Sequence, residues 1–165
     1  MTLTRERLKE IVRYCPETGN FTWIMDRGGA WAGKNAGCRK NTKSGYVSIR
    51  IDTLLYRAHR VAWLYVHGEW PELHIDHING VRDDNRIANL RLATQQQNLY
   101  NKGAAKNSKT GVKGVCWDSS TNRYQVKIAV NGRAKHIGRY DTVEEGAAAY
   151  AEASRKYHGE FSRTA

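Results

Sequence analysis

The chain has 165 residues, with 27 Lys and Arg against 16 Asp and Glu, which gives a formal net charge of +11. This length suits one ordinary domain or two or three very small ones. Hydrophobic residues make up 40% of the chain, enough for small cores, which argues against a disordered tail protein. No window approaches the roughly 18 apolar residues of a membrane-spanning helix, and the start MTLTRERLKE lacks the apolar core of a secretory signal. We therefore expect a cytoplasmic protein without a membrane partner.

The excess of positive charge predicts an anionic polymer as partner, because each neutralised phosphate releases condensed counterions from a nucleic acid. The alternative is a basic protein that is merely soluble. The cysteines Cys15, Cys38 and Cys116 are odd in number and never form a CxxC pair, so neither a disulfide framework nor a zinc ribbon is indicated.

The first part of the chain is predicted to hold short helices and hairpins. Apolar spacing indicates a helix over Leu3 to Val12, followed by the turn CPETGN and a strand around Phe21 and Trp23. The basic stretch 27–43 reads as a loop that either binds DNA or is only a connection. Alternating residues in YVSIRI then predict a hairpin that turns at Asp52-Thr53, before the helix HRVAWLYVHG.

Residues 72–101 read ELHIDHINGVRDDNRIANLRLATQQQNLYN, a pattern of strand, loop, strand and helix. Thr94 with Gln97 forms a capping box at the helix start, which places Asn98 in the first helical turn. Asp76 and His77 fall near the end of the first strand. These three side chains are therefore candidates to converge.

After the linker NKGAAKNSKTG, the segments GVKGVCW, RYQVKIAV and RAKHIGRY predict three strands, the last two joined by a tight turn at Asn131-Gly132. The helix TVEEGAAAYAEASRKYHG follows, with a capping box formed by Thr142 and Glu145. One face of the sheet is apolar and the other is polar and basic.

The third strand of this segment contains a conflict of side-chain parity. If Ile137 points to the helix, then Arg133, Lys135 and Arg139 point the same way. Either their charged ends reach past the helix to water, or a bulge shifts the register.

The spacing of His77, Asn89 twelve residues on and Asn98 nine further resembles the HNH nuclease motif, in the variant whose last histidine is asparagine. More widely, YRAHRVAWLYVHGEWPELHIDHINGVRDDNRIANLRLAT resembles the phage-type HNH homing endonucleases. The resemblance implies a ββα-metal site. In it His77 is the general base, Asp76 and Asn98 are the metal ligands, and Asn89 pins the loop that carries His77.

The chemistry of these residue types supports the implied roles. A neutral imidazole, with a pKa of about 6.5, suits proton removal from water near neutral pH. Asp76 and Asn98 offer only oxygen ligands, which favours one divalent cation, Mg²⁺ or else Mn²⁺. The resemblance also implies a phage or prophage gene and action in the cytoplasm of a bacterial host.

For several residues near these candidates, the sequence leaves two interpretations open. Asp83, Asp84 and Asn85 either supply another metal ligand or serve only as turn residues. His74 either touches substrate or is solvated. The pair His59 and Arg60 either stabilises the fold or contacts phosphate.

The passages GVKGV, IGRYDTVEEGAAAY and HGEF resemble the plant ethylene-response-factor (APETALA-type) DNA-binding domain over about 50 residues. The resemblance implies that the sheet enters the DNA major groove with its exposed face. The residues expected on that face are Lys113, Trp117, Arg123, Gln125, Lys127 and His136. The base preference does not transfer, because family arginine or tryptophan positions are here Cys116, Ala129, Ala134 and His136.

The combined expectation is an α+β protein: a ββα-metal HNH core with an N-terminal helix and hairpin region, linked to a three-stranded antiparallel sheet on one helix. The expected nuclease region is 1–100 with its core at about 72–101, the linker 101–110, and the DNA-binding domain 111–165. The expected activity is site-specific cleavage of double-stranded DNA, giving 5′-phosphate and 3′-hydroxyl ends. The alternatives are a non-cleaving DNA-binding regulator and, less supported, an RNA-directed protein. No obligate protein partner is indicated.

Overall fold

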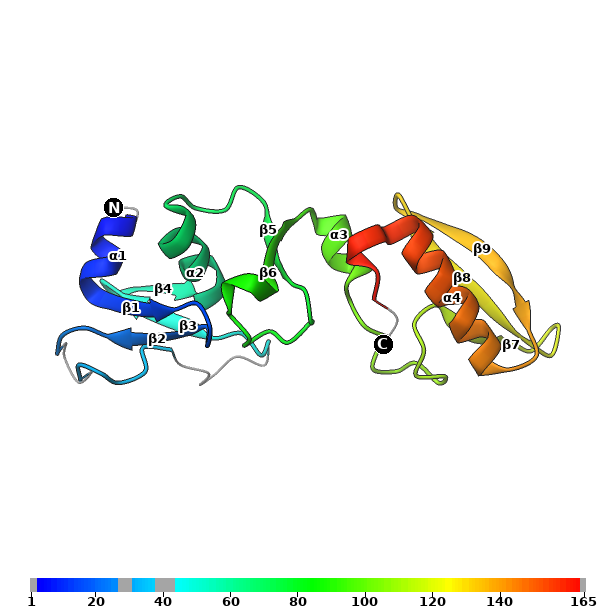
Figure 1. Cartoon of the computed structure of the whole chain (residues 1–165). Coiled ribbons are helices and arrows are strands. Elements are labelled where there is room, and N and C mark those ends of the chain that lie inside the picture. The colour runs from blue at the N-terminus through cyan, green and yellow to red at the C-terminus, as the bar shows by residue number, and fades with distance from the viewer. Residues whose placement is uncertain (1–2, 27–30, 38–43, 164–165) are drawn as a thin grey trace. The chain divides into compact units, whose positions relative to one another are not determined.

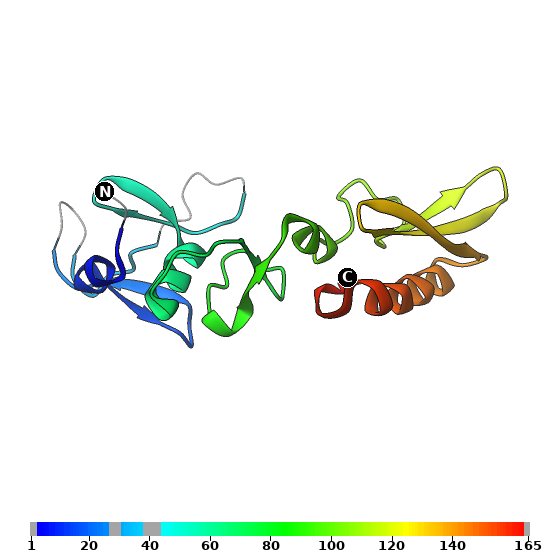
Figure 2. The same cartoon turned by 90° about the horizontal axis from the view of Figure 1, so that it is seen from above.

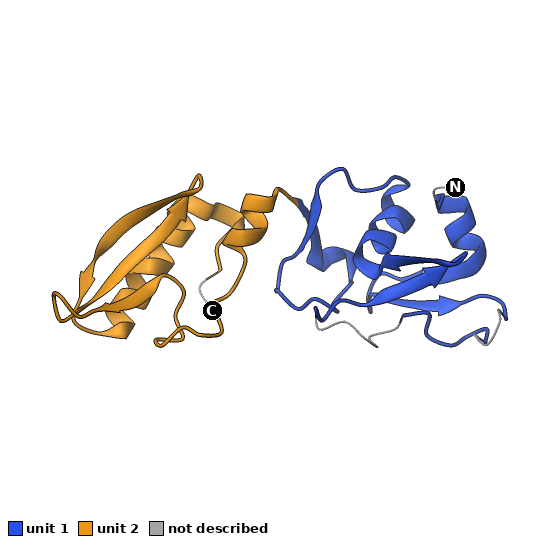
Figure 3. Ribbon diagram, turned by 180° about the vertical axis from the view of Figure 1, so that it is seen from behind, with its two compact units in different colours: residues 1–92 blue, residues 93–165 orange. Residues whose placement is uncertain are grey.

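The chain folds around two separate hydrophobic cores, as the computed structural model describes for residues 3–26, 31–37 and 44–163. Residues 1–92 form one compact unit and residues 93–165 a second (Figure 3). Helices are mixed with small antiparallel sheets, so the expected α+β class is confirmed. Of the basic loop expected over residues 27–43, positions 27–30 and 38–43 lie outside the described residues.

The elements of the first unit are short and are joined mainly as hairpins. In the described residues β1 pairs with β2, β3 with β4, and β5 with β6 (Figure 1). In chain order the elements are α1 (Arg5–Ile11), β1 (Val12–Cys15), β2 (Asn20–Trp23), β3 (Ser48–Ile51), β4 (Leu54–Arg57), α2 (Ala58–His67), β5 (His74–His77), the 3₁₀ turn η1 (Ile87–Asn89) and β6 (Leu90–Ala93).

Local side-chain contacts set where these elements begin and turn. The Thr4 hydroxyl accepts from the Arg7 amide and caps α1, which ends at Ile11. The expected helix therefore ends one residue early, because Val12 is already extended and begins β1. The predicted hairpin turn is confirmed: Asp52 and Thr53 have φ of 44° and 72°. Arg7 holds the carboxylate of Asp52 at 3.0 and 3.1 Å, which stabilises this strained turn.

The core of the first unit lies between its two helices and the hairpin of β3. Each fully buried aliphatic side chain contributes about 1.5–3 kcal/mol relative to exposure. The helix α2 ends where Gly68 adopts φ of 89°, as the sequence predicts. The fully buried aliphatic side chains of this core include Leu8, Ile11, Val12, Ile49, Ile51, Val61 and Leu64.

The second unit is a three-stranded antiparallel sheet in the order β7-β8-β9 with one helix along its apolar face (Figures 1 and 2). Both predicted capping boxes are confirmed, at Thr94 with Gln97 and at Thr142 with Glu145. The predicted turn at Asn131-Gly132 is also present. The elements are α3 (Gln95–Tyr100), β7 (Val115–Asp118), β8 (Arg123–Val130), β9 (Arg133–Tyr140), α4 (Val143–His158) and η2 (Gly159–Phe161).

A bulge in β9 resolves the parity conflict of the third strand. Val126 pairs with Gly138 whereas Lys127 pairs with His136, so Ile137 is the extra residue. Before the bulge, Lys135 lies opposite Ile128 and its Nζ donates to the Tyr157 hydroxyl of α4 at 2.7 Å.

After the bulge, Arg139 lies opposite Gln125 and therefore on the polar face. Both expected solutions are thus used in one strand. Before the bulge, Lys135 reaches along α4. After the bulge, the changed register places Arg139 on the polar face.

Gly114 provides a sensitive test of the packing between the second sheet and α4. Its φ is +73°, and an added Cβ would lie 2.3 Å from the Tyr150 ring and 2.4 Å from the Lys127 carbonyl oxygen. We expect Gly114→Ala to lower the free energy of unfolding by about 3 kcal/mol, from backbone strain plus crowding.

The matched control is Gly111→Ala, because Gly111 has φ of +69° with nothing within 4 Å of an added Cβ. This variant should lose only the strain, about 1–2 kcal/mol. Urea denaturation of both variants measures the difference, and equal losses would contradict the crowding of Gly114.

Candidate active site

Asp76 and His77 end strand β5, and both side chains are buried, with exposed fractions of 7% and 4%. The neighbouring strand β6 holds this end of β5 in the two-stranded sheet. A loop then runs from Ile78 to Asn89, and the Ile78 amide donates to the Asn89 carbonyl oxygen at 2.9 Å. The two ends of the loop are therefore fixed against each other beside His77.

The side chain of Asn89 ties this loop internally. Its Oδ1 accepts from the Asn79 amide at 3.0 Å, and its Nδ2 donates to the Asp84 carbonyl oxygen at 2.8 Å. A side chain that both donates and accepts is required at this position, because one contact is to an N–H and the other to a carbonyl. Asn89 is buried, so the loss of either contact would leave an unpaired polar group.

Asn85 orients the imidazole of His77. Its Oδ1 lies 3.4 Å from Nε2 of His77, while its Nδ2 donates to the Asp83 carbonyl oxygen at 3.2 Å. Because Nδ2 is engaged as a donor, Oδ1 is the amide atom that faces the ring. The proton of the neutral imidazole therefore sits on Nε2, and Nδ1 carries the lone pair.

The N-terminal hairpin in turn holds Asn85 in place. The Tyr14 hydroxyl donates to the Asn85 carbonyl oxygen at 2.8 Å, and both residues are buried. Gly19, in the turn between β1 and β2, approaches so closely that an added Cβ would lie 2.5 Å from the Asn85 carbonyl carbon. The hairpin is thus a structural support of the candidate site.

Arg91 of β6 holds Asp76. Its Nε and Nη2 lie 2.9 and 2.8 Å from Oδ2 of Asp76, and both side chains are largely buried. The guanidinium compensates a carboxylate charge that burial alone would disfavour. Within the described residues, no group of three or more His, Cys, Asp or Glu side chains is gathered to hold a metal ion.

Two other aromatic rings pack against His77. His59 of α2 and Tyr46 have ring centroids 5.2 and 5.8 Å from that of His77, and their own centroids are 5.1 Å apart. Burial lowers the pKa of His77 below its usual value, although Asn85 and Asp76 oppose the shift. Burial, together with the nearby His77 and arginines, lowers the pKa of His59 to about 3. Both rings are therefore neutral at pH 7.

The candidate residue Asn98 belongs to the second unit, where it lies half-buried on α3. This helix packs on the sheet and helix of its own unit. The Tyr100 ring stacks on His158 at 3.7 Å, and Lys113 Nζ donates to the carbonyl oxygens of Leu99 and Tyr100 at 3.2 and 2.6 Å. Asp76, His77 and Asn89 are thus brought together in one unit, and Asn98 is part of the other.

The open face of the second sheet carries most of the polar residues expected there. Arg123, Gln125 and Lys127 alternate along β8, and the register places Arg139 and His136 opposite Gln125 and Lys127. Arg123 and Lys127 are exposed, as is His136. This face therefore presents a row of cationic and amide donors.

Two residues expected on this face lie elsewhere, and both placements are corrected. Trp117 pairs with Tyr124 and so shares the face of Val115, which is buried under α4. The face of Trp117 follows from the register of β7 against β8, which the sequence alone does not give. Lys113 precedes β7 and donates to α3, and burial lowers its pKa to about 8.

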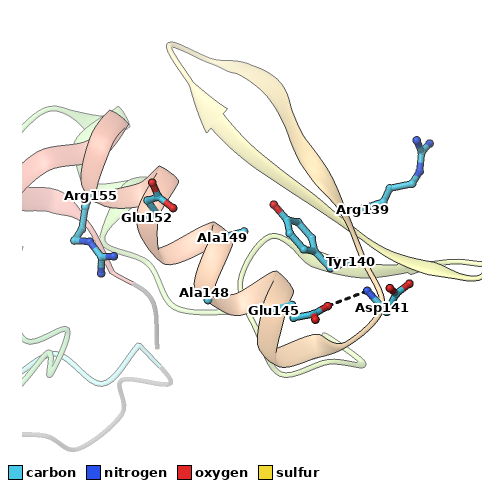
Figure 4. Close-up of a pocket in the computed structure, with 8 residues that line it drawn as sticks. All are labelled: Arg139, Tyr140, Asp141, Glu145, Ala148, Ala149, Glu152 and Arg155. Carbon is cyan, nitrogen blue, oxygen red and sulfur yellow. Dashed lines mark hydrogen bonds between the residues drawn. The ribbon is translucent and has the colours of Figure 1, made fainter.

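A groove of about 660 Å³ on the other side of the second sheet has a different chemistry (Figure 4). It lies between the end of β9 and α4, and the Asp141 amide donates to Glu145 across it at 3.1 Å. The charged residues that line the groove are Asp141, Glu145 and Glu152 together with Arg139 and Arg155, and the Arg139 side chain points away from α4 in Figure 4. The groove therefore carries both signs of charge, whereas the open face of the sheet presents the row of cationic and amide donors.

Sequence reasoning missed three contacts to the candidate residues. The sequence marks Asn85 as a turn residue or metal ligand, whereas in the structure it contacts His77. Arg91 and Tyr46 were not singled out, and no local signal marks them, because each contact joins residues distant in sequence. For Arg91, the alternation of β6 opposite β5 was the available signal.

Comparison with known proteins finds similarity over most of the chain. Residues 56–100 match the family described as HNH endonuclease. The chain is 34% identical over 122 residues to an "Uncharacterized HNH endonuclease L560" of Acanthamoeba polyphaga mimivirus, covering 73% of this chain and 62% of that relative's length. It is 30% identical over 108 residues to "Protein 3.8" of Escherichia phage T7, covering 65% of this chain and 88% of that protein. No solved structure matches, and no helix in the described part of the chain could cross a membrane.

Acidification should destabilise the first unit through His59. The unfolded imidazole takes up a proton near pH 6.5, whereas the folded one does so only at about pH 3. The unfolded state therefore binds more protons in this window, and the free energy of unfolding falls as the pH drops from 6.5 towards 3. Each pH unit costs up to about 1.4 kcal/mol for this group.

Urea denaturation at pH 7, 6, 5 and 4 measures this slope. His59→Leu should flatten it, whereas His67→Leu, at an exposed position of the same helix, should leave it unchanged. Equal slopes in wild type and His59→Leu would contradict the buried neutral imidazole.

Proposed function

Because this chain belongs to the HNH endonuclease family, we propose that it is a metal-dependent, site-specific DNA endonuclease of the homing type. The proposed reaction hydrolyses one phosphodiester bond to a 5′-phosphate and a 3′-hydroxyl. The observation that carries the proposal is the pair Asp76 and His77, with the imidazole oriented by Asn85 and the loop tied by Asn89. The segment that matches the family, residues 56–100, includes Asp76, His77, Asn89 and Asn98.

His77 is the proposed general base, and its acting atom is Nδ1. Since Nε2 donates to Asn85, Nδ1 can accept a proton from the attacking water. The water oxygen then bonds to phosphorus, the bond to the 3′ oxygen breaks, and that oxygen takes a proton from solvent. The lowered pKa keeps the imidazole neutral and ready to accept a proton at pH 7.

The donor chemistry fits a hard divalent cation, with Mg²⁺ favoured and Mn²⁺ as the second choice. Asp76 would contribute a carboxylate oxygen and Asn98 an amide oxygen, the ligand types such cations prefer. Arg91 fixes the Asp76 carboxylate through two contacts to Oδ2. When bound, the cation would offset the negative charge that gathers on phosphate oxygens in the transition state.

The second unit is proposed as a DNA-binding domain of the ethylene-response-factor type over residues 111–165. The open face of its sheet supports this role, because Arg123, Gln125, Lys127 and His136 offer donors to base edges and phosphates. Arg123 is paired with Asp141 at 2.7 Å, an exposed contact that phosphate can replace at small cost. Trp117 remains a candidate at the edge of the sheet, 49% exposed. Double-stranded DNA is the proposed partner.

The place of action is proposed to be the cytoplasm of a bacterial host, from a phage or prophage gene. The relative from Escherichia phage T7 supports this proposal, because it comes from a phage of a bacterium.

Cleavage of supercoiled plasmid libraries carrying phage and host DNA tests the nuclease directly. With Mg²⁺ or Mn²⁺ we expect nicked or linear products, and EDTA should abolish them. His77→Ala should lower the cleavage rate by about 10²–10⁴-fold, the usual contribution of a general base. His67→Ala, an exposed histidine of α2, is the matched control with the wild-type rate. Tight binding of duplex DNA without cleavage across the libraries would instead favour a non-cleaving regulator.

The DNA-binding face is tested by two lysines on opposite faces of one sheet. Lys127 lies on the open face, whereas Lys135 faces α4 and bonds Tyr157. Lys127→Ala should reduce the slope of log affinity against log salt by about 0.9, corresponding to one phosphate contact. Lys135→Ala should leave the slope nearly unchanged. Binding titrations with a DNA duplex at several salt concentrations measure both, and equal changes would contradict this face.

A further inference from the structure

His59 is the residue of the first unit whose role the sequence leaves open, and the structure places it against the proposed general base. Its ring stands almost perpendicular to that of His77, at 84°, with centroids 5.2 Å apart. Tyr46 contacts both rings, at 5.1 Å from His59 and 5.8 Å from His77. Three rings from three separate parts of the unit therefore form one cluster.

The position of His59 carries a cost that a purely structural residue would avoid. The residue is 8% exposed, and among the described residues its Nδ1 is buried without a hydrogen-bond partner. An unpaired buried nitrogen is unfavourable, and an apolar side chain of similar size would remove the penalty. A polar ring at this position is therefore not explained by packing alone.

His77 needs more than one contact to hold its orientation. The torsion that turns an imidazole about its Cβ–Cγ bond is broad, and half a turn puts Cδ2 in the place of Nδ1 and Cε1 in the place of Nε2, so that neither nitrogen keeps its position. The contact with Asn85 selects Nε2, but at 3.4 Å it is a long hydrogen bond. The edge of a flat ring packed against His77 opposes this rotation, and imidazole is the smallest flat ring among protein side chains.

We propose that His59 is a positioning residue of the nuclease: its ring, packed edge-on against His77, holds the general base with Nε2 towards Asn85 and Nδ1 towards the attacking water. This inference rests on the proposed function, since it assigns His59 a role through His77. His59 itself touches no reacting atom in this scheme. The property that matters is the flat shape of the ring.

Two substitutions separate ring shape from simple burial. His59→Leu fills the site with apolar volume but has no flat edge, whereas His59→Phe keeps one. We expect His59→Leu to melt at or above the wild-type temperature while kcat falls by about 10–100-fold with KM within twofold, as for a misplaced catalytic group. His59→Phe should recover most of the lost kcat. His67→Phe, on the exposed end of α2, controls for added aromatic surface.

The tautomer of His77 provides a readout that does not depend on cleavage. Long-range ¹H–¹⁵N correlation spectra distinguish a proton on Nε2 from one on Nδ1, and comparison with His77→Ala assigns the signals. Wild type and His59→Phe should show the Nε2–H form alone, and His59→Leu a mixture, because a turned ring loses the Asn85 contact that selects the Nε2–H form. If His59→Phe fails to fold, the spectrum of His59→Leu still decides the question.

The outcomes separate this inference from the proposed function. A wild type that never cleaves, with a mixed tautomer in His59→Leu, overturns the nuclease and retains the positioning role. A single Nε2–H tautomer in His59→Leu overturns the positioning role, whatever happens to kcat. A wild-type kcat in His59→Leu does the same.

Discussion

The candidate site depends on the amide of Asn89, which bonds an N–H and a carbonyl of the same loop. These contacts, at 3.0 and 2.8 Å, hold the loop after β5 in one conformation. That conformation places Asn85 beside His77, and through Asn85 it selects the nitrogen that carries the proton. Asn89, which has no reactive group, thus determines which nitrogen of His77, the proposed general base, carries the proton. Tyr14 and Gly19 extend the same constraint to the N-terminal hairpin.

The features that sequence predicts well are those decided within a few residues. The capping boxes at Thr94 and Thr142 and the turn at Asn131-Gly132 depend only on neighbouring side chains and backbone preferences. The contacts of Arg91 with Asp76 and of His59 with His77 join separate elements, so no local pattern reveals them. Sequence spacing therefore marks which residues are candidates, whereas their partners follow only from tertiary packing.

The second sheet shows how register decides chemistry. Counting alternate positions along β9 assigns its arginines and lysine to one face, but the extra residue Ile137 divides them between two. Lys135 then packs along α4, and Arg139 joins the open face. The predicted face of Trp117 is wrong for a related reason. Its face follows from its pairing with Tyr124 and not from its neighbours in sequence.

The packing of α3 limits where one unit of this protein can be exchanged for a unit of another protein. Tyr100 stacks on His158, and Lys113 holds the last carbonyls of the helix, so α3 is built into the second unit although it precedes the glycine- and lysine-rich segment 101–110. If the chain were cut within that segment to exchange the second unit, α3 would lose its contacts with both His158 and Lys113. A working exchange has to cut before α3, near the boundary at residues 92 and 93, or else preserve a tyrosine and a matching histidine on either side of the junction.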